Sequence, residues 1–253
     1  MSQTKRALRL RAEVPAEVPH TAMIMAAGLG KRMRPLTATK PKPLIEVNGK
    51  ALLDHVLEKL RDAGVRKVVV NVHYLADALE AHLTSRTHGL EVLISDERDL
   101  LMETGGGLIK AVPLIDSDPF LALNSDNLWI DGPADTLKLL ASQWDDSKMD
   151  ALLLLVPQAR ALNHKGMGDF HMDRVGRLRR RDRSHVAPFV FTGIQIVSKR
   201  LLREAPAGPF STNILWDRAI DQGRCFGAVH QGLWFDVGTP QSIQMTETAL
   251  ENV

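Results

Sequence analysis

The sequence predicts an α/β protein with one mostly parallel sheet. From Thr21 onward, short β-branched runs alternate with amphipathic stretches, as in strands that feed crossover helices. Residues 22–27 form a continuous apolar run that ends in glycine, which is typical of a strand buried on both faces. With 253 residues, of which 44% are hydrophobic, the chain can bury a large core. We expect a single domain over residues 20–253.

The first half of the chain is expected to supply most of the sheet. Residues 51–64 are predicted to be helical because Leu52, Val56 and Leu60 fall on one face and a glycine ends the segment. The remaining elements follow from the same patterns, with strands at 22–27, 67–72, 90–96, 120–126 and 151–156, and helices at 75–83, 104–115 and 134–144.

The pattern changes after Pro157, where glycine-punctuated, shorter strands and loops predict antiparallel additions to the same sheet. Helices are expected again at 213–223 and 240–253, with a short strand, "WFDV", between them. The arginine-rich stretch 177–183 contains no aromatic residue and includes Asp182. It favours a solvated hairpin over a nucleic-acid surface.

Composition narrows the partners and the compartment. The formal charge is only +2, from 32 Lys and Arg against 30 Asp and Glu, so a global affinity for polyanions is not expected. The single cysteine, Cys225, suits a reducing compartment. No apolar stretch approaches the roughly 20 residues of a membrane span. These features predict a cytoplasmic protein with no nucleic-acid or membrane partner. Residues 1–19, basic and then rich in Pro and Glu, are expected to be a flexible extension. No pattern indicates the oligomeric state.

Residues 23–37, "MIMAAGLGKRMRPLT", have the composition of a phosphate-binding turn. A P-loop is excluded because its glycines must be separated by four residues and followed by Lys and a hydroxyl side chain, whereas Gly28 and Gly30 are one residue apart. A dinucleotide fingerprint is disfavoured because its third glycine is replaced by Met33 and Pro35 interrupts the following helix.

The remaining interpretation is a glycine loop surrounded by cations. Lys31, Arg32 and Arg34 follow the glycines, and Lys42 lies between two prolines that stiffen its loop. Backbone amides and converging cations of this kind suit a triphosphate whose charge grows on the leaving side during reaction.

The stretch "AAGLGKRMRPLT" followed by "KPKPL" resembles the signature of the sugar-nucleotidyltransferase family, whose members join a nucleoside triphosphate to a sugar 1-phosphate and release pyrophosphate. The similarity extends from about Met23 to the C-terminus. It implies a Rossmann-like, three-layer α/β/α nucleotidyltransferase fold, with a mostly parallel mixed sheet and a small antiparallel elaboration on the acceptor side.

The resemblance also implies the nucleotide side of the site. Arg32 would hold the departing phosphates, Lys42 the α-phosphate, and Asp126 would complete the catalytic set. The residues implied in nucleotide binding are Ala26, Ala27, Gly28, Gly30, Lys31, Arg32, Lys42, Gly105 and Gly106.

Magnesium is the expected cofactor, because nucleotidyl transfer depends on alignment and charge neutralisation and Mg²⁺ prefers one or two carboxylates with phosphate oxygens and water. Asp126 ends an apolar strand, where ligands gather in open α/β sheets, and Asp236 lies in "WFDVGTP". Either residue alone is more typical of a turn or a cap, but both match the metal-binding positions that the resemblance implies. Ser125 departs from the family's usual glycine before the first of them.

The acceptor side rests on the resemblance alone. The residues implied in sugar binding are Glu103, Asn124, Asp169, Thr192 and Gly193. Within the family the chain most resembles a compact, single-domain branch that transfers a uridylyl group to N-acetylmuramate α-1-phosphate in peptidoglycan recycling. Mannose-1-phosphate guanylyltransferases and enzymes for other hexose 1-phosphates remain alternatives, and so does a sugar-nucleotide sensor without activity.

Overall fold

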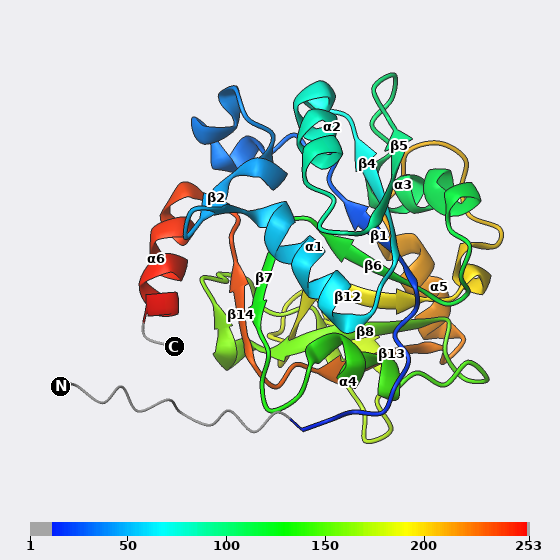
Figure 1. Ribbon diagram of the computed structural model, residues 1–253. Coiled ribbons are helices and arrows are strands. Elements are labelled where there is room, and N and C mark those ends of the chain that lie inside the picture. Colours follow the sequence, from blue (N-terminus) through cyan, green and yellow to red (C-terminus); the bar gives the residue numbers. More distant parts are fainter. Residues whose placement is uncertain (1–11, 252–253) are drawn as a thin grey trace.

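A mixed sheet forms the centre of the molecule in the computed structural model, which describes residues 12–251 (Figure 1). Its parallel half contains, in spatial order, β5 (Glu91–Asp96), β4 (Lys67–Val72), β1 (Thr21–Met25) and β6 (Phe120–Asn124). Beyond β6, the long strand β12 (Phe189–Val197) runs antiparallel, and β8 (Ala151–Pro157) and β13 (Cys225–Val229) complete the sheet. The hairpin β10 (Phe170–Met172) and β11 (Leu178–Arg180) pairs with the start of β12.

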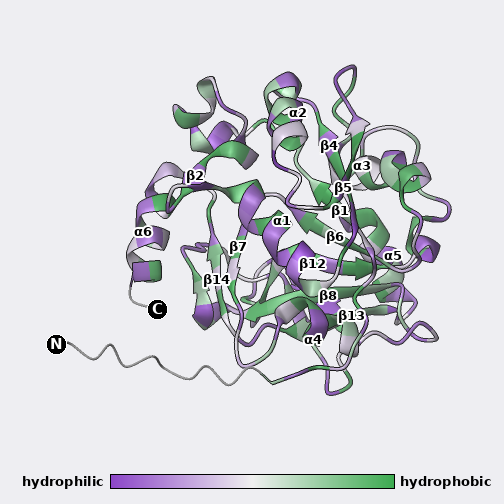
Figure 2. Cartoon of the chain, viewed as in Figure 1, coloured by the Kyte–Doolittle hydropathy of each residue, from purple (hydrophilic) through white to green (hydrophobic). Residues whose placement is uncertain are grey.

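Helices cover both faces of this sheet, which gives the expected three layers. One face is covered by α1 (Leu52–Ala63), α2 (Ala76–Ser85) and α4 (Thr136–Ser142), whose leucines enter the first hydrophobic core. The other face is covered by α3 (Glu103–Ala111) and α5 (Asn213–Asp221), which share a second core with the opposite side chains of the same strands. Figure 2 shows the apolar residues concentrated on the strands and the polar ones on the outer surfaces of the helices.

A third, smaller core lies at one end of the sheet. It joins Met33, Leu52, Leu128 and Phe235 with apolar residues of the C-terminal helix α6 (Pro240–Glu251). The strands around it are β2 (Glu46–Val47) with β3 (Lys50–Ala51), and a separate sheet of β7 (Asn127–Ile130), β14 (Leu233–Asp236) and β9 (Ala161–Leu162). In Figure 1, α6 lies beside β2 and β14.

Short 3₁₀ turns make up the rest of the regular structure. Three of them follow β1, at η1 (Lys31–Met33), η2 (Leu36–Ala38) and η3 (Lys42–Leu44). The others are η4 (Val112–Leu114), η5 (Gln158–Arg160) and η6 (Lys199–Leu202).

The sequence patterns located most elements and missed five short strands. The predicted strand 67–72 coincides with β4, and the antiparallel additions after Pro157 are present. The predicted helix 104–115 is shorter, because α3 ends at Ala111 and a 3₁₀ turn continues to Leu114. The strands β2, β3, β7, β9 and β13 were not predicted.

The N-terminal extension is described only in part. Residues 1–11 lie outside the described residues. Farther along, the Ala12 N–H donates a hydrogen bond to the Pro133 carbonyl at 2.8 Å, and Val18 packs against the first core. The division of the chain at residue 19 stays a prediction. Within residues 12–251, no helix combines the length and the apolar character that a membrane crossing needs.

Candidate active site

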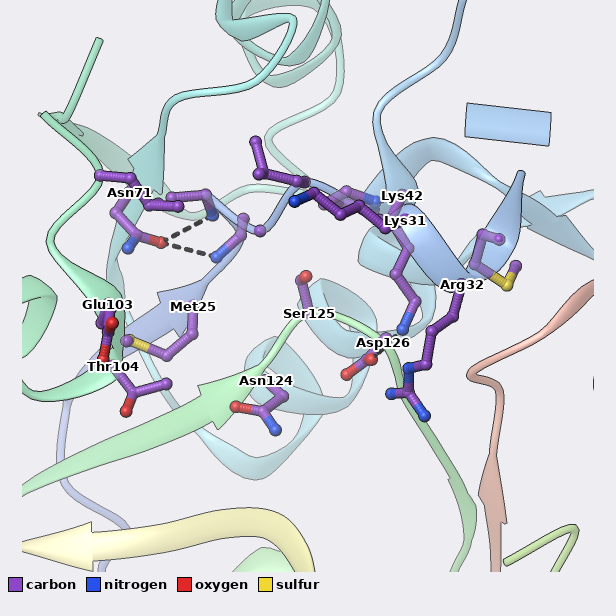
Figure 3. A pocket seen from close by; sticks show the side chains of 18 of the residues that line it. Met25, Lys31, Arg32, Lys42, Asn71, Glu103, Thr104, Asn124, Ser125 and Asp126 are labelled. Atoms are coloured by element: carbon purple, nitrogen blue, oxygen red, sulfur yellow. Dashed lines mark hydrogen bonds and ion pairs between the residues drawn. The ribbon is translucent and has the colours of Figure 1, made fainter. Parts of the chain in front are cut away.

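A cavity of about 620 Å³ opens where β1 and β6 end at the carboxyl edge of the parallel strands (Figure 3). Met25 and Asn124, the last residues of these strands, lie in its floor, and the loops that follow them form its walls. Ten of the predicted site residues line it, namely Ala26, Ala27, Gly28, Gly30, Lys31, Arg32, Lys42, Glu103, Asn124 and Asp126. The cavity therefore brings the predicted nucleotide loop and the first predicted metal carboxylate together.

The glycine loop turns tightly at Gly30. This residue has φ of 59°, and a Cβ there would lie 2.9 Å from Cγ2 of Thr37 and 3.2 Å from Cβ of Lys42. Thr37 closes the turn by donating its hydroxyl hydrogen bond to the Gly30 carbonyl at 2.9 Å. The absence of a side chain thus allows Lys42 to approach the loop.

Asn71, which the sequence reasoning missed, holds the start of the loop. Its Oδ1 accepts hydrogen bonds from the N–H groups of Ala26 at 2.6 Å and Ala27 at 3.2 Å. Its Nδ2 donates to Oε1 of the buried Glu97 at 2.8 Å, and Oε2 of Glu97 accepts from the Met102 N–H at 3.0 Å. The available signal was one polar residue within the apolar strand "KVVVNV".

The next three backbone amides along the loop are suited to binding an anion. Among residues 12–251, no hydrogen-bond partner is found for the N–H groups of Gly28, Leu29 or Gly30. Successive unpaired backbone N–H groups in such a turn form a concave site for phosphate oxygens. The Ala26 and Ala27 amides are already bonded to Asn71, so these two residues have only their carbonyl groups free for a ligand.

Cations lie at one end of the cavity. In Figure 3, Arg32 and Lys42 lie beside Asp126, whereas Asn71 lies at the other end. Lys42 Nζ forms an ion pair with Oδ2 of Asp126, and the Lys42 side chain is only 14% exposed. A Cβ on Gly238 would lie 3.3 Å from Nη1 of Arg32, so this guanidinium lies against the turn after β14. Lys31 lines the cavity and Arg34 does not.

The second predicted metal carboxylate lies close to the first because of strand pairing. β14 runs antiparallel to β7, and Asp236 is paired with Asn127, the residue after Asp126. Nδ1 of His164 lies 3.5 Å from Oδ2 of Asp236. Within the described part of the chain, no group of three or more His, Cys, Asp or Glu side chains could hold a metal ion. Two carboxylates nevertheless suit Mg²⁺, whose other ligands are commonly phosphate oxygens and water.

Ser125 keeps ordinary backbone geometry at this point. Its N–H donates to the Met25 carbonyl at 3.1 Å, which continues the pairing of β6 with β1, and its φ is not positive. The site therefore does not need the glycine that the family usually has there.

Gly105 and Gly106 are buried in α3 and do not line the cavity. Their N–H groups donate to the Phe210 carbonyl at 2.8 and 3.2 Å, and a Cβ on Gly105 would lie 2.3 Å from the Phe210 ring. These glycines allow a close approach, as the sequence suggests, but the group that approaches them is Phe210. Glu103 and Thr104, which directly precede these glycines, do line the cavity.

Of the predicted sugar-binding residues on the acceptor side, three do not line the cavity, namely Asp169, Thr192 and Gly193. A Cβ on Gly193, which has φ of 84°, would lie 2.6 Å from Nδ2 of Asn124. Thr192 is buried and donates its hydroxyl hydrogen bond to the Leu154 carbonyl at 2.9 Å, and Oδ2 of Asp169 accepts from the Phe191 N–H at 2.9 Å. These residues shape the irregular part of β12, and their contact with a sugar stays a prediction.

A second cavity of about 240 Å³ adjoins the first and shares with it Met25, Thr104, Asn124 and Ser211. It lies between α3, β12 and α5, because its other walls come from those elements. The first cavity thus continues into a smaller space on the side away from the cations.

Comparison with known proteins agrees with this geometry. Residues 21–176 match the family model described as nucleotidyl transferase. The chain is 42% identical over 238 residues to the N-acetylmuramate alpha-1-phosphate uridylyltransferase of Caulobacter vibrioides, covering 93% of this chain and 98% of that protein. It is 30% identical to the mannose-1-phosphate guanylyltransferase catalytic subunit beta of Danio rerio, over 87% of this chain and 61% of that protein.

Solved structures show the same fold at low sequence identity. The inositol-1-phosphate CTP transferase of T. maritima superposes with a TM-score of 0.74 at 18% identity, over 92% of this chain and 97% of that one. A putative glucose-1-phosphate thymidylyltransferase of Bacillus anthracis gives a TM-score of 0.75 at 17% identity, over 92% and 96% of the two chains. The three-layer fold is thereby confirmed, and the chain belongs to the nucleotidyl transferase family as an enzyme of the transferase class.

Proposed function

We propose that the protein transfers a uridylyl group from UTP to N-acetylmuramate α-1-phosphate, forming UDP-N-acetylmuramate and pyrophosphate. The observation that carries the reaction class is the juxtaposition of a cation-lined cavity, with three unpaired loop amides, and a second cavity that adjoins it. The choice of substrates is supported by the 42% identity to the relative of that name over nearly the whole chain.

The reaction needs alignment and charge neutralisation more than covalent help from the protein. A phosphate oxygen of the sugar 1-phosphate attacks the α-phosphorus of UTP, the bond from that phosphorus to the bridging oxygen breaks, and pyrophosphate leaves with the electron pair. The attacking phosphate is already an anion at neutral pH, so no general base is required.

Each part of the cavity then has a task. The amides of Gly28, Leu29 and Gly30 bind phosphate oxygens, and Arg32 with Lys31 neutralises the departing pyrophosphate. Lys42 stabilises the charge at the α-phosphate. Asp126 and Asp236 would hold Mg²⁺, which when bound supplies further positive charge to the phosphates.

The acceptor is proposed to lie beyond the α-phosphate, toward the second cavity. Asn124 and Thr104 line both spaces and are placed to contact a sugar that spans them. Glu103 lines only the first cavity and is a candidate for sugar or ribose hydroxyls. We also propose that the enzyme acts in the cytoplasm, where UTP is made, and that it returns N-acetylmuramate from peptidoglycan to cell-wall synthesis.

A second candidate is transfer of a guanylyl group to mannose 1-phosphate, which is supported by the relative of that name in Danio rerio. That relative is longer, and this chain spans 61% of it. The two reactions share their phosphate chemistry and differ in the base and the sugar.

The test is a pyrophosphate-release matrix with purified protein. UTP, GTP, CTP and dTTP are each combined with N-acetylmuramate 1-phosphate, N-acetylglucosamine 1-phosphate, mannose 1-phosphate and glucose 1-phosphate, with and without Mg²⁺. The proposal expects the highest kcat/KM for UTP with N-acetylmuramate 1-phosphate. A preference for GTP with mannose 1-phosphate would establish the second candidate, and no release from any pair would favour the sensor.

A further inference from the structure

The second cavity contains a buried amide whose nitrogen is free. Gln195 of β12 lines this cavity and is only 6% exposed. Its Oε1 accepts a hydrogen bond from Nε1 of Trp216 at 2.9 Å. Among residues 12–251, no partner is found for its Nε2.

The bond to Trp216 fixes which way this amide faces. An indole N–H is only a donor, so the oxygen of Gln195 must face it and the NH₂ group must face away. Trp216 is itself 7% exposed and packs edge-on against Phe191, with ring centroids 4.8 Å apart. The amide is therefore held in a single orientation, and its NH₂ group is left for a ligand or water in the cavity.

The surroundings of Gln195 are apolar on one side. The same cavity is lined by Leu108, Phe191 and Trp216. It opens toward the first cavity at Asn124 and Thr104, which line both. A ligand group that fits this space presents an oxygen acceptor to Nε2 and an apolar part to the rings. A plain sugar hydroxyl meets only part of this description, because it brings no apolar group to Phe191 and Trp216.

We propose that Gln195 is a specificity-determining residue that recognises an acyl oxygen on the acceptor sugar, with Phe191 and Trp216 packing against the attached methyl group. Acceptors with an acetamido or a lactyl substituent carry this chemistry, and unsubstituted hexose 1-phosphates lack it. The inference rests on the proposed transfer to a sugar 1-phosphate and adds the residue that selects among such acceptors.

The central test uses Gln195→Glu, which keeps an oxygen for Nε1 of Trp216 and replaces the donor NH₂ by a second oxygen. Two ratios of kcat/KM are measured with UTP. N-acetylglucosamine 1-phosphate against glucose 1-phosphate reports on the acetamido group, and N-acetylmuramate 1-phosphate against N-acetylglucosamine 1-phosphate reports on the lactyl group. Acceptors that turn over too slowly are compared by their inhibition constants.

We expect one of these two ratios to fall by about tenfold or more in Gln195→Glu, because a site built to hydrogen-bond a substituent discriminates strongly against its absence. The ratio that falls identifies the substituent. The KM for UTP is expected to stay at its wild-type value. Gln143→Glu, a matched change at an exposed glutamine, should leave both ratios unchanged.

Trp216→Phe provides a second measurement in case a carboxylate at position 195 prevents folding. It keeps an aromatic ring against Phe191 and removes the N–H that orients Gln195. The ratio that falls in Gln195→Glu should therefore fall here too, with a smaller loss of thermal stability than in Gln195→Glu. If both ratios stay unchanged in every variant that folds, the inference is wrong. If the wild-type protein releases no pyrophosphate with any acceptor, the proposed function itself fails.

Discussion

At the scale of single residues, the glycines around the site differ in what a side chain would meet. A Cβ on Gly105 would lie 2.3 Å from the Phe210 ring, whereas a Cβ on Gly28 would meet nothing within 4 Å. Gly28 lines the first cavity and Gly105 does not. The first is therefore placed to affect function, and the second to affect packing.

Alanine at position 105 should reduce stability, whereas alanine at position 28 should reduce activity. Gly105→Ala is expected to lower the free energy of unfolding by about 1–3 kcal/mol, because the new methyl group overpacks the second core. Gly28→Ala should change it by less than about 0.5 kcal/mol, while the methyl group enters the cavity and lowers kcat/KM. Denaturant unfolding and pyrophosphate release measure the two effects. The assignment would be reversed if Gly28→Ala lost stability and kept full activity.

Asp126 gives the sharpest test of the metal assignment. Asp126→Asn removes a negative charge from the ion pair with Lys42 and from the proposed magnesium site. It should lower kcat by a factor on the order of 10² or more, as removal of a transition-state charge contact does, with little change in melting temperature. Asp182→Asn, at an exposed aspartate that pairs with Arg179, is the matched control. Near-wild-type Mg²⁺-dependent turnover in Asp126→Asn would show that the metal is bound elsewhere.

The sequence identified the residues of the site better than it identified the groups that contact them. The glycine loop, Lys42 and Asp126 were found from spacing and resemblance, and the structure brings them to one cavity. Gly105 and Asn71 show the limit. A glycine reports that something comes close without identifying it, and a buried asparagine does not state which amides it bonds.

At the scale of secondary-structure elements, β1, β4 and β5 are linked to α3 through side chains at their ends. Asn71 of β4 holds the amides that follow β1, and Glu97, which follows β5, holds both Asn71 and the residue before α3. The loop after β1 is thus ordered by its neighbours before any ligand binds, which lowers the entropic cost of binding phosphates.

Asn71→Ala should therefore affect both stability and nucleotide binding. It leaves the two buried N–H groups of Ala26 and Ala27 and Oε1 of Glu97 without their partner, so we expect the free energy of unfolding to fall by about 1–3 kcal/mol. The KM for UTP should rise more than that for the sugar 1-phosphate. Gln158→Ala, which removes a surface amide bonded to the Gly166 carbonyl, is the control. Equal changes in the two KM values would mean that Asn71 acts only through general stability.

Elements were predictable where burial was complete on both faces. The strand 67–72 is apolar at residues 68–70 and 72 because helices cover both of its sides, so its bounds follow from composition. β7 has only four residues and begins directly after Asp126, and β13 has a glycine at its centre. The pairing of Asp236 with Asn127 depends on two strands far apart in the sequence, which no local pattern specifies.

At the scale of the whole molecule, His230 connects the main sheet to the small sheet of β7, β14 and β9. Its N–H donates to the Leu155 carbonyl of β8 at 2.7 Å, and its Nε2 lies 3.1 Å from the Leu233 carbonyl of β14. The side chain is 1% exposed. Burial lowers the pKa of His230 below its ordinary value of 6.5, although the hydrogen bond to Leu233 acts in the opposite direction.

This pKa shift predicts a loss of stability on mild acidification. The unfolded chain takes up a proton near pH 6.5, while the folded protein keeps His230 neutral to lower pH. The stabilising contribution is therefore complete above that pH and is lost as the pH falls toward the folded pKa. Urea unfolding between pH 8 and pH 5 should show this slope, and His230→Gln should reduce it.

The slope should not vanish in that variant, because burial also lowers the pKa of His55. His185→Gln, at an exposed position, is the control and should leave the slope unchanged. An unchanged slope in His230→Gln would contradict the assignment of this shift to the junction of the two sheets.

The third core has a consequence for the order in which the enzyme is made. It packs Met33 of the glycine-loop segment against Phe235 and the C-terminal helix α6. In the sequence, Asp236 and Gly238 lie between Phe235 and α6. During synthesis on the ribosome, the parallel strands leave the exit tunnel long before the strand that carries Asp236. A nascent chain can therefore order the parallel strands β1, β4, β5 and β6 early, whereas the second proposed magnesium ligand joins the site only once β14 has emerged.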